Sequence, residues 1–193
     1  MMNDTTISGL ISEIHRREYG KLVSVLTRIF GLSNLEIVED AVQDTFIKAS
    51  ISWRKKIPNS PEAWLTKAAK NRVIDIIRKI NRDKNQSEFK FQGTDTITIQ
   101  EFFLDNEIED AQLRMICTAC HPRLEARDRI AFALKTVSGF SSKEIASALL
   151  IKEETIKKRL MRAKKLIKQE KIPFTIPQGK SLEIRLSSIL EVL

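Results

Sequence analysis

Apolar residues recur every three or four positions over much of the chain, as in Ile7, Leu10, Ile11 and Ile14. This spacing places them on one face of an α-helix, so each periodic stretch predicts a helix with one buried side. The predicted helices cover residues 7–31, 34–51, 61–82, 107–120, 124–138, 142–150 and 153–170.

Three of these helices also have start signals in the sequence. Ser33 with Glu36, and Ser141 with Glu144, have the spacing of a capping box. In that motif each side chain accepts a hydrogen bond from the other residue's backbone N–H. Pro61 follows a serine, and proline is favoured at the first helical position. Because glycine (6) and proline (5) are also scarce among the 193 residues, the predicted fold class is all-α.

The helical periodicity fades between residues 83 and 110, where eight acidic residues and two lysines give a net charge of −6. Such a stretch is typical of a linker. The apolar run TITIQEFF inside it fits either a short strand or an apolar anchor. On either side of this stretch the chain is basic. Residues 53–82 hold nine basic and two acidic residues, and residues 141–171 hold ten basic and four acidic residues. We therefore predict two helical domains joined by an acidic linker.

The formal net charge of +8 indicates a polyanionic partner, a nucleic acid before a membrane. No apolar run approaches the roughly 20 residues needed to cross a bilayer. The first residues, MMNDTTISGL, show neither a basic segment nor an apolar core of a signal peptide. We therefore expect a cytoplasmic protein with no membrane partner and with both cysteines reduced.

The stretch SSKEIASALLIKEETIKKRLMRAKK has the pattern of a helix-turn-helix. Its apolar residues fall where two short, steeply crossing helices would touch, and Ala146 is small where they come closest. The cations gather on the second helix, as in a recognition helix. Leu150 stands where glycine usually makes the turn, and Lys152 stands where a capping Ser or Thr is favoured. The alternative is an ordinary helical hairpin with a solvated lysine face.

Trp53 and Trp64 are interleaved with the cations of residues 53–82. Aromatic rings among cations suit unpaired, exposed bases better than an intact duplex. Alternatively, Trp64 is a core aromatic residue and Trp53 anchors a loop.

A C-x-x-C-H run is formed by Cys117, Cys120 and His121, the signature of c-type haem or part of a zinc site. On a helix these three residues share one face, so burial of small side chains also explains them. Zinc would need a fourth ligand, and the only other histidine, His15, is distant in sequence. We therefore predict no metal, no haem and no other cofactor.

Three stretches together resemble the extracytoplasmic-function (ECF) sigma factors of the bacterial sigma-70 family. VEDAVQDTFIKASISW, PEAWLTKAAKNRVIDIIRK and FSSKEIASALLIKEETIKKRLMRAKKLIK are similar to regions 2.2, 2.3–2.4 and 4.2 of that family. RMICTACHPRL, KIPFTIP and LEIRLSSILEVL resemble a subgroup in which a tetratricopeptide-like C-terminal domain follows and the Cys-His-Pro stretch holds no haem; here that extension is truncated or absent. The resemblance implies a sigma-2-like domain (1–82), a linker (83–110), a sigma-4-like domain (111–172) and the start of the extension (173–193).

The resemblance implies a protein without enzyme activity that binds core RNA polymerase, recognises −35 and −10 promoter elements and promotes strand opening. Its implied partners are promoter DNA, the clamp of the largest polymerase subunit, the flap of the second-largest subunit, and an inhibitory protein or the chain's own C-terminal domain. The residues implied for polymerase binding are Asp40, Gln43, Asp44 and Phe46. Those implied for the −10 element are Trp53, Asn59, Trp64, Lys67, Lys70, Asn71, Arg72 and Arg78. Those implied for the −35 element are Thr155, Lys157, Lys158, Arg159, Met161 and Arg162.

A second interpretation is a stand-alone helix-turn-helix transcription regulator with a helical dimerisation domain. This alternative leaves the Trp-containing loop and the basic helix of the first domain without a role. It also predicts tight binding to duplex DNA without polymerase.

Overall fold

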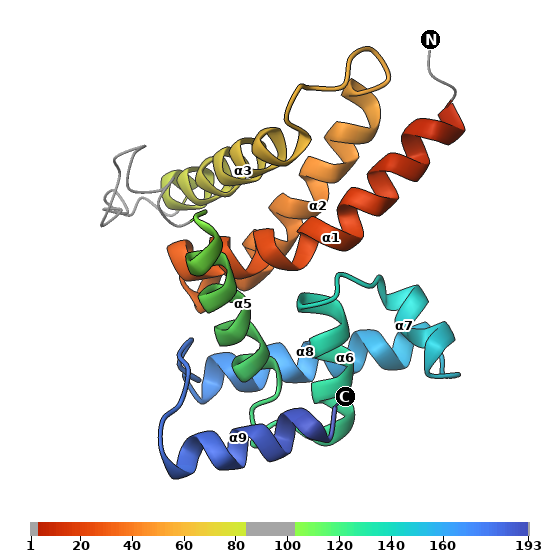
Figure 1. Ribbon diagram of the computed structural model, residues 1–193. Helices are drawn as coiled ribbons and strands as arrows, with labels where there is room; N and C mark the ends of the chain where they lie inside the picture. The colour runs from red at the N-terminus through yellow and green to blue at the C-terminus, as the bar shows by residue number, and fades with distance from the viewer. Residues whose placement is uncertain (1–3, 84–102, 193) are drawn as a thin grey trace.

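The chain folds into helices throughout the residues that the computed structural model describes, 4–83 and 103–192 (Figure 1). No strand occurs in these ranges, which confirms the all-α prediction. The elements in chain order are α1 (Asp4–Phe30), the 3₁₀ turn η1 (Leu32–Asn34), α2 (Leu35–Ser52), α3 (Pro61–Asp83), α5 (Asp105–Ala119), α6 (Ala126–Thr136), α7 (Ser142–Ala148), α8 (Glu153–Gln169) and α9 (Lys180–Leu190). Every predicted helix is present, with both ends within three residues of the prediction.

The first lobe consists of α1, α2 and α3, and α2 packs against both of its neighbours (Figure 1). Val38, Val42, Leu65 and Val73 are fully buried between them. α3 begins at Pro61, as predicted, at a position where the missing backbone N–H breaks no helical hydrogen bond. The lobe thus holds α2 and α3 in fixed register and leaves one face of each open.

The start of α2 differs from the prediction. Ser33 is not its N-cap, because residues 32–34 form a 3₁₀ turn after Gly31, whose φ is 87°. The N-cap is Asn34, and its side chain donates to the carbonyl of Phe30 (2.7 Å) instead of capping α2. A tight link between α1 and α2 therefore replaces the predicted capping box.

The second lobe consists of α5, α6, α7 and α8, with α7 and α8 packed against α6. Phe132, Ile145 and Ile156 are buried where these three helices meet. The predicted capping box at the start of α7 is confirmed. Ser141 Oγ accepts from the Glu144 backbone N–H (3.2 Å), and Glu144 Oε2 accepts from the Ser141 backbone N–H (2.8 Å).

The turn between α7 and α8 has the shape of a helix C-terminus that ends in a left-handed residue. Leu150 has a φ of 54°, and the backbone N–H of Ile151 donates to the carbonyl of Ala146 (3.0 Å). Lys152 is the N-cap of α8 and its side chain makes no capping hydrogen bond. Both departures from the preferred residues, Leu for glycine and Lys for Ser or Thr, therefore fall at the predicted positions.

The two lobes pack directly against each other, which the sequence did not predict. α5 packs against the C-terminal part of α1 (Figure 1), and Arg28 on α1 pairs with Glu107 (2.6 Å) and Asp110 (2.8 Å) on α5. The last acidic residues of the predicted linker therefore belong to a helix, because Arg28 neutralises them and carboxylates favour a helix N-terminus. The greater part of that linker, including most of TITIQEFF, lies outside the described residues.

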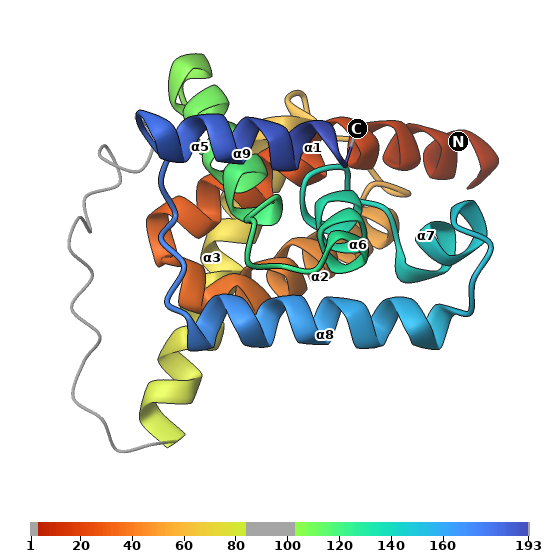
Figure 2. The same cartoon turned by 90° about the horizontal axis from the view of Figure 1, so that it is seen from below.

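α9 packs against α5, and α8 and α9 lie on different sides of α5 and α6 (Figure 2). Arg185 on α9 is buried and donates to the backbone carbonyl of Cys117. Arg129 on α6 is also buried and pairs with Glu191 (2.6 Å), just after α9. Among the described residues, no helix is both long and apolar enough to span a membrane.

Candidate nucleic-acid interface

α3 carries a stripe of exposed polar side chains opposite its buried face. Lys67, Asn71 and Arg78 are exposed and lie four and seven positions apart, on one side of the helix. Trp64 and Lys70 flank the stripe and are half-buried. Within the described ranges, none of its cations is joined to a carboxylate by an ion pair. Five of the eight residues predicted for −10 DNA are thus brought together on one surface.

Trp53 is buried, with 2% of its surface exposed, and packs edge-on against Trp64, with ring centroids 5.6 Å apart. A buried ring cannot stack on a base, so direct base contact by Trp53 is not possible in this conformation. Its observed position agrees with the alternative interpretation as a loop anchor. Trp53 instead supports Trp64, whose ring reaches the surface beside the stripe.

The loop between α2 and α3 (residues 54–60) adjoins the N-terminal end of this stripe (Figure 1). Asn59 is exposed in it, together with Arg54, Lys55 and Lys56. These cations lie next to the tryptophan pair. The loop therefore extends the basic surface of α3 with an amide group that can donate and accept hydrogen bonds.

α2 exposes a mostly acidic face. Asp40, Gln43 and Asp44, predicted to bind polymerase, are exposed on it. Phe46 is buried, and its ring lies edge-on to His15 with centroids 4.7 Å apart. Phe46 thus packs in the core of the lobe, and its contact with polymerase stays a prediction.

Sequence reasoning missed two apolar residues on the exposed face of α2. Ile47 is 54% exposed and Ile51 is 65% exposed. Both fall between the buried positions of α2 and follow Asp44 at helical spacing, so an apolar patch continues the acidic one. The sequence did contain a signal for this patch, because an isoleucine that falls outside the buried positions of a helix suggests contact with another molecule.

Arg72 does not belong to the stripe on α3. It turns toward α2, where its Nε (2.9 Å) and Nη2 (2.7 Å) both donate to Oδ2 of Asp44. Both side chains are about half exposed. One residue predicted for DNA and one predicted for polymerase are thus paired with each other.

α8 presents most of the residues predicted for −35 DNA on its solvent side. Thr155, Lys157, Lys158 and Met161 are exposed, and Arg159 is half-buried. The buried face consists of residues at i, i+4, i+7 and i+11, namely Ile156, Leu160, Ala163 and Ile167. The helix is therefore held by one face and offers the opposite face for binding.

Arg162 is exposed but already paired. Its Nε (3.0 Å) and Nη2 (2.7 Å) donate to the two carboxylate oxygens of Asp128 on α6, a side chain that is 7% exposed. A contact with a base through Nε and Nη2 requires Arg162 to release this buried carboxylate, which costs free energy. The pair fixes α8 against α6.

Cys117 and Cys120 are buried thiols beside the guanidinium of Arg185. Burial raises the pKa of Cys120 to about 11, so it stays protonated at neutral pH, whereas metals bind the thiolate. Burial lowers the pKa of His121 to about 4. Across the described residues, no cluster of three or more His, Cys, Asp or Glu side chains could hold a metal ion.

Comparison with family models matches both lobes. The model described as Sigma-70 region 2 matches residues 14–83, which cover most of α1 and all of α2 and α3. The model described as Sigma-70, region 4 matches residues 114–167, from α5 to α8. The two basic helices, α3 and α8, each lie in a different matched region.

Curated relatives agree with these matches. An uncharacterized protein of Rhizobium meliloti is 30% identical over 83% of this chain, which spans 39% of that protein. The ECF RNA polymerase sigma factor SigE of Mycolicibacterium smegmatis is 24% identical over 81% of the chain and 59% of its own length. The ferric citrate uptake sigma factor FecI of Escherichia coli is 25% identical over 82% of the chain and 89% of its own length. The chain therefore spans less than two thirds of the length of the first two relatives. With both regions matched in order, and with an ECF sigma factor and a second sigma factor among its relatives, the chain belongs to the ECF branch of the sigma-70 family.

Proposed function

We propose that the chain acts as a dissociable subunit of RNA polymerase that recognises −35 and −10 promoter elements and promotes strand opening. The observation that carries this proposal is the presence of two separate basic helices, α3 and α8, in segments that match regions 2 and 4. Two DNA-contacting lobes suit a promoter with two elements. A stand-alone regulator would need α8 alone.

The α3 stripe is the proposed contact for the unpaired −10 strand. Lys67, Lys70 and Arg78 offer phosphate contacts, and Asn71 among them can read a base edge. Trp64, supported by Trp53, can stack on a flipped base, a contact worth about 1–3 kcal/mol. Asn59 in the adjoining loop completes the proposed surface.

The exposed side of α8 is the proposed reader of the −35 element. Lys158 and Met161 are its central residues, with Thr155 and Lys157 toward the helix N-terminus. A cation can donate to guanine, and an apolar side chain can contact a thymine methyl group. Arg162 is proposed to fix the helix through Asp128, and to offer Nε and Nη2 to DNA after it releases that carboxylate.

The exposed face of α2 is the proposed contact for the clamp of the largest polymerase subunit. Asp40, Gln43 and Asp44 give it polar specificity, and Ile47 and Ile51 supply the apolar area that protein interfaces bury at their centre. Contacts of the second lobe with the flap of the second-largest subunit, and with an inhibitory protein, stay predictions.

The test is run-off transcription with core RNA polymerase on genomic fragments, followed by mapping of the start sites. Addition of the chain should yield discrete transcripts that core enzyme alone does not make. Lys67→Ala should reduce these transcripts several-fold, since it removes a cation from the stripe. Lys79→Ala is the matched control, because Lys79 is another exposed cation of α3 and lies outside the stripe.

Asn71→Ala extends the same test to strand opening. On duplex promoters this variant should transcribe weakly, and a template pre-melted around the −10 position should restore part of the activity. If the chain yields no specific transcripts but binds duplex DNA tightly without polymerase, the stand-alone regulator is the better description.

A further inference from the structure

The first turn of α6 is held from two sides. Asp128 and Arg129 are consecutive residues of this turn, and both are buried, with 5% and 7% of their surface exposed. Asp128 accepts two hydrogen bonds from the guanidinium of Arg162 on α8. Arg129 donates to Oε2 of Glu191 (2.6 Å), the C-cap residue of α9. Because α8 and α9 lie on different sides of α5 and α6 (Figure 2), this single turn connects the two helices.

Arg129 depends on its contact with Glu191. The Arg129 side chain is 8% exposed, and its Nε has no hydrogen-bond partner within the described residues. A buried charge that loses its counterion is costly. Without the carboxylate of Glu191, the first turn of α6 would have to move to bring the guanidinium to solvent. Asp128 would move with it, because it is the next residue in the same turn.

α9 is itself fixed to the second lobe by another buried arginine. Arg185 donates to the carbonyl of Cys117 in the last turn of α5, where helical carbonyls have no partner within the helix. A cation is also favoured at that end of a helix. The chain between α8 and α9 is attached to the same lobe, since Ile172 is buried and Arg114 Nη1 donates to the carbonyl of Phe174 (3.4 Å). Residues 172–191 are therefore part of the second lobe.

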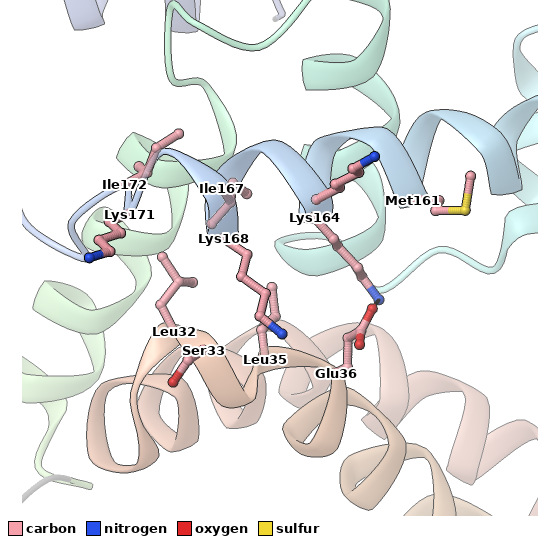
Figure 3. Close-up of a pocket in the computed structure, with 11 residues that line it drawn as sticks. Leu32, Ser33, Leu35, Glu36, Met161, Lys164, Ile167, Lys168, Lys171 and Ile172 are labelled. Atoms are coloured by element: carbon pink, nitrogen blue, oxygen red, sulfur yellow. Dashed lines mark ion pairs between the residues drawn. The ribbon is translucent and has the colours of Figure 1, made fainter.

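α8 has a second set of ion-pair contacts, on the side that faces the first lobe. Lys164 Nζ lies 3.9 Å from Oε1 of Glu36 (Figure 3) and 2.7 Å from Oε2 of Glu39. Two positions along a helix correspond to a rotation of about 200°, so Lys164 and Arg162 leave α8 on different sides. The pair between Arg162 and Asp128 is the one that α9 can influence through α6.

We infer that α9 holds the recognition helix α8 in position through the first turn of α6, and that Arg129 and Glu191 are positioning residues for −35 recognition. The inference rests on the proposed function, in which the exposed side of α8 reads the −35 element. It adds residues outside the segment that matches Sigma-70 region 4, because that match ends at residue 167. Loss of the Glu191 charge lets the first turn of α6 move, and the pair that orients α8 moves with it.

The first test measures amide hydrogen exchange in the full chain. Glu191→Gln removes the charge and keeps the shape of a side chain that is 60% exposed. Glu183→Gln is the matched control, because Glu183 is an exposed carboxylate of α9 without an ion pair among the described residues. The amides of α8 should exchange faster in Glu191→Gln, on the order of threefold to tenfold, while those of α3 keep the wild-type rates. Wild-type exchange of α8 in Glu191→Gln would overturn the inference.

The second test distinguishes positioning from general stabilisation by a double-mutant cycle. Filter binding measures the affinity of the reconstituted holoenzyme for a promoter mapped by run-off transcription. Glu191→Gln should weaken this binding on the order of threefold to tenfold, and Glu191→Asp, which keeps the charge, should restore part of it. In the Arg162→Ala background, Glu191→Gln should have little further effect, because the pair that connects α6 to α8 is already absent.

Equal losses in the two backgrounds would overturn the inference, since α9 would then act independently of Arg162. Unchanged or tighter promoter binding by Glu191→Gln would overturn it as well. If the wild-type chain yields no specific transcripts with core polymerase, the proposed function fails. The hydrogen-exchange comparison then still decides whether α9 holds α8 in position.

Discussion

The two basic helices look alike in sequence and differ in how their cations are used. Residues 53–82, which include all of α3 except Asp83, carry a net charge of +7, and residues 141–171, which include α8, carry +6. The stripe on α3 is free of ion pairs within the described residues. On α8, by contrast, Lys157, Arg162 and Lys164 each pair with an acidic side chain.

This difference shows that net charge alone does not measure a DNA-binding surface. A free cation gains from each phosphate it meets, because counterions are released from the DNA. A cation that is paired with a buried carboxylate must first break that pair. The cost of leaving the carboxylate buried without a partner then offsets part of the free energy gained from the phosphate. We therefore expect the stripe on α3 to bind DNA with all of its cations, and α8 to bind DNA with only part of its cations.

The largest expected effect tests whether the α3 stripe depends on the tryptophan packed behind it. Trp53→Ala removes a fully buried ring and should lower the free energy of unfolding by about 3–5 kcal/mol, because a large cavity is left between α2 and α3. Asn71→Ala, at an exposed position, should change it by less than about 0.5 kcal/mol. Urea unfolding followed by circular dichroism measures both values.

Transcription separates the two roles. Asn71→Ala should lose activity while stable, whereas Trp53→Ala should lose activity together with stability. If Trp53→Ala unfolds at the same urea concentration as the wild type, the ring is not a structural anchor.

The second prediction concerns the two cations of α8 that share one face. Lys158→Ala should reduce the slope of log K against log salt concentration by about 1, because a free cation held close to the DNA displaces counterions even where it faces a base. Arg162→Ala should reduce the slope less, because the Arg162 guanidinium is already paired with the carboxylate of Asp128. It should instead lower the melting temperature, since a buried carboxylate loses its partner.

Filter binding to DNA at four salt concentrations measures the slope, and thermal unfolding of the same variants measures the melting temperature. The reverse outcome, a large slope change for Arg162→Ala without a change in melting temperature, would mean that Arg162 leaves Asp128 freely and reads DNA directly.

The helices could be predicted from the sequence because each buries one stripe of apolar residues, and that stripe is local information. The start of α3 at Pro61 and the capping box at Ser141 are local in the same sense. The failed cap at Ser33 is different, because the bend at Gly31 sets where α2 begins. That bend depends on how α1 packs against α2.

The residues of the candidate site could be predicted only in part, because some of them are positioned by contacts with other helices. Which cations lie on one face of α3 follows from spacing. Whether Arg162 is free follows from the approach of α6, and whether Phe46 is exposed follows from the ring of His15 on α1. No pattern within a single helix contains that information.

The third prediction concerns pH and the second lobe. Burial first, and then the charges of Arg185 and Arg123, lower the pKa of His121 from 6.5 to about 4. Its Nδ1 accepts from the backbone N–H of Arg123 (3.2 Å), which requires the neutral ring. The unfolded chain therefore binds a proton near pH 6.5 that the folded chain does not bind until about pH 4.

Stability should accordingly fall as the pH decreases from about 6.5 toward 4, by about 1–2 kcal/mol when the partial exposure of His121 is allowed for. His121→Asn keeps an acceptor for the Arg123 N–H and does not titrate, so it should lose less stability between pH 7 and pH 5. His15→Asn is the comparison in the first lobe: burial also lowers the pKa of His15, so this variant should lose less stability between the two pH values as well. Urea unfolding at the two pH values measures the difference. Equal losses in wild type and His121→Asn would show that this histidine does not set the acid sensitivity.

The smallest expected effect lies at the turn that leads into α8. Leu150 is held at a φ of 54° with 92% of its surface exposed, so it bears the strain of a left-handed conformation and gains almost nothing from packing. Leu150→Gly should raise the free energy of unfolding by about 0.5–1 kcal/mol, since relief of that strain exceeds the entropy that glycine adds to the unfolded chain. Leu150→Ala keeps a Cβ and therefore the strain, so its urea midpoint should stay near that of the wild type. A lower midpoint for the glycine variant than for the alanine variant would mean that the exposed leucine stabilises the turn, and that α8 is fixed at its start as well as through Arg162.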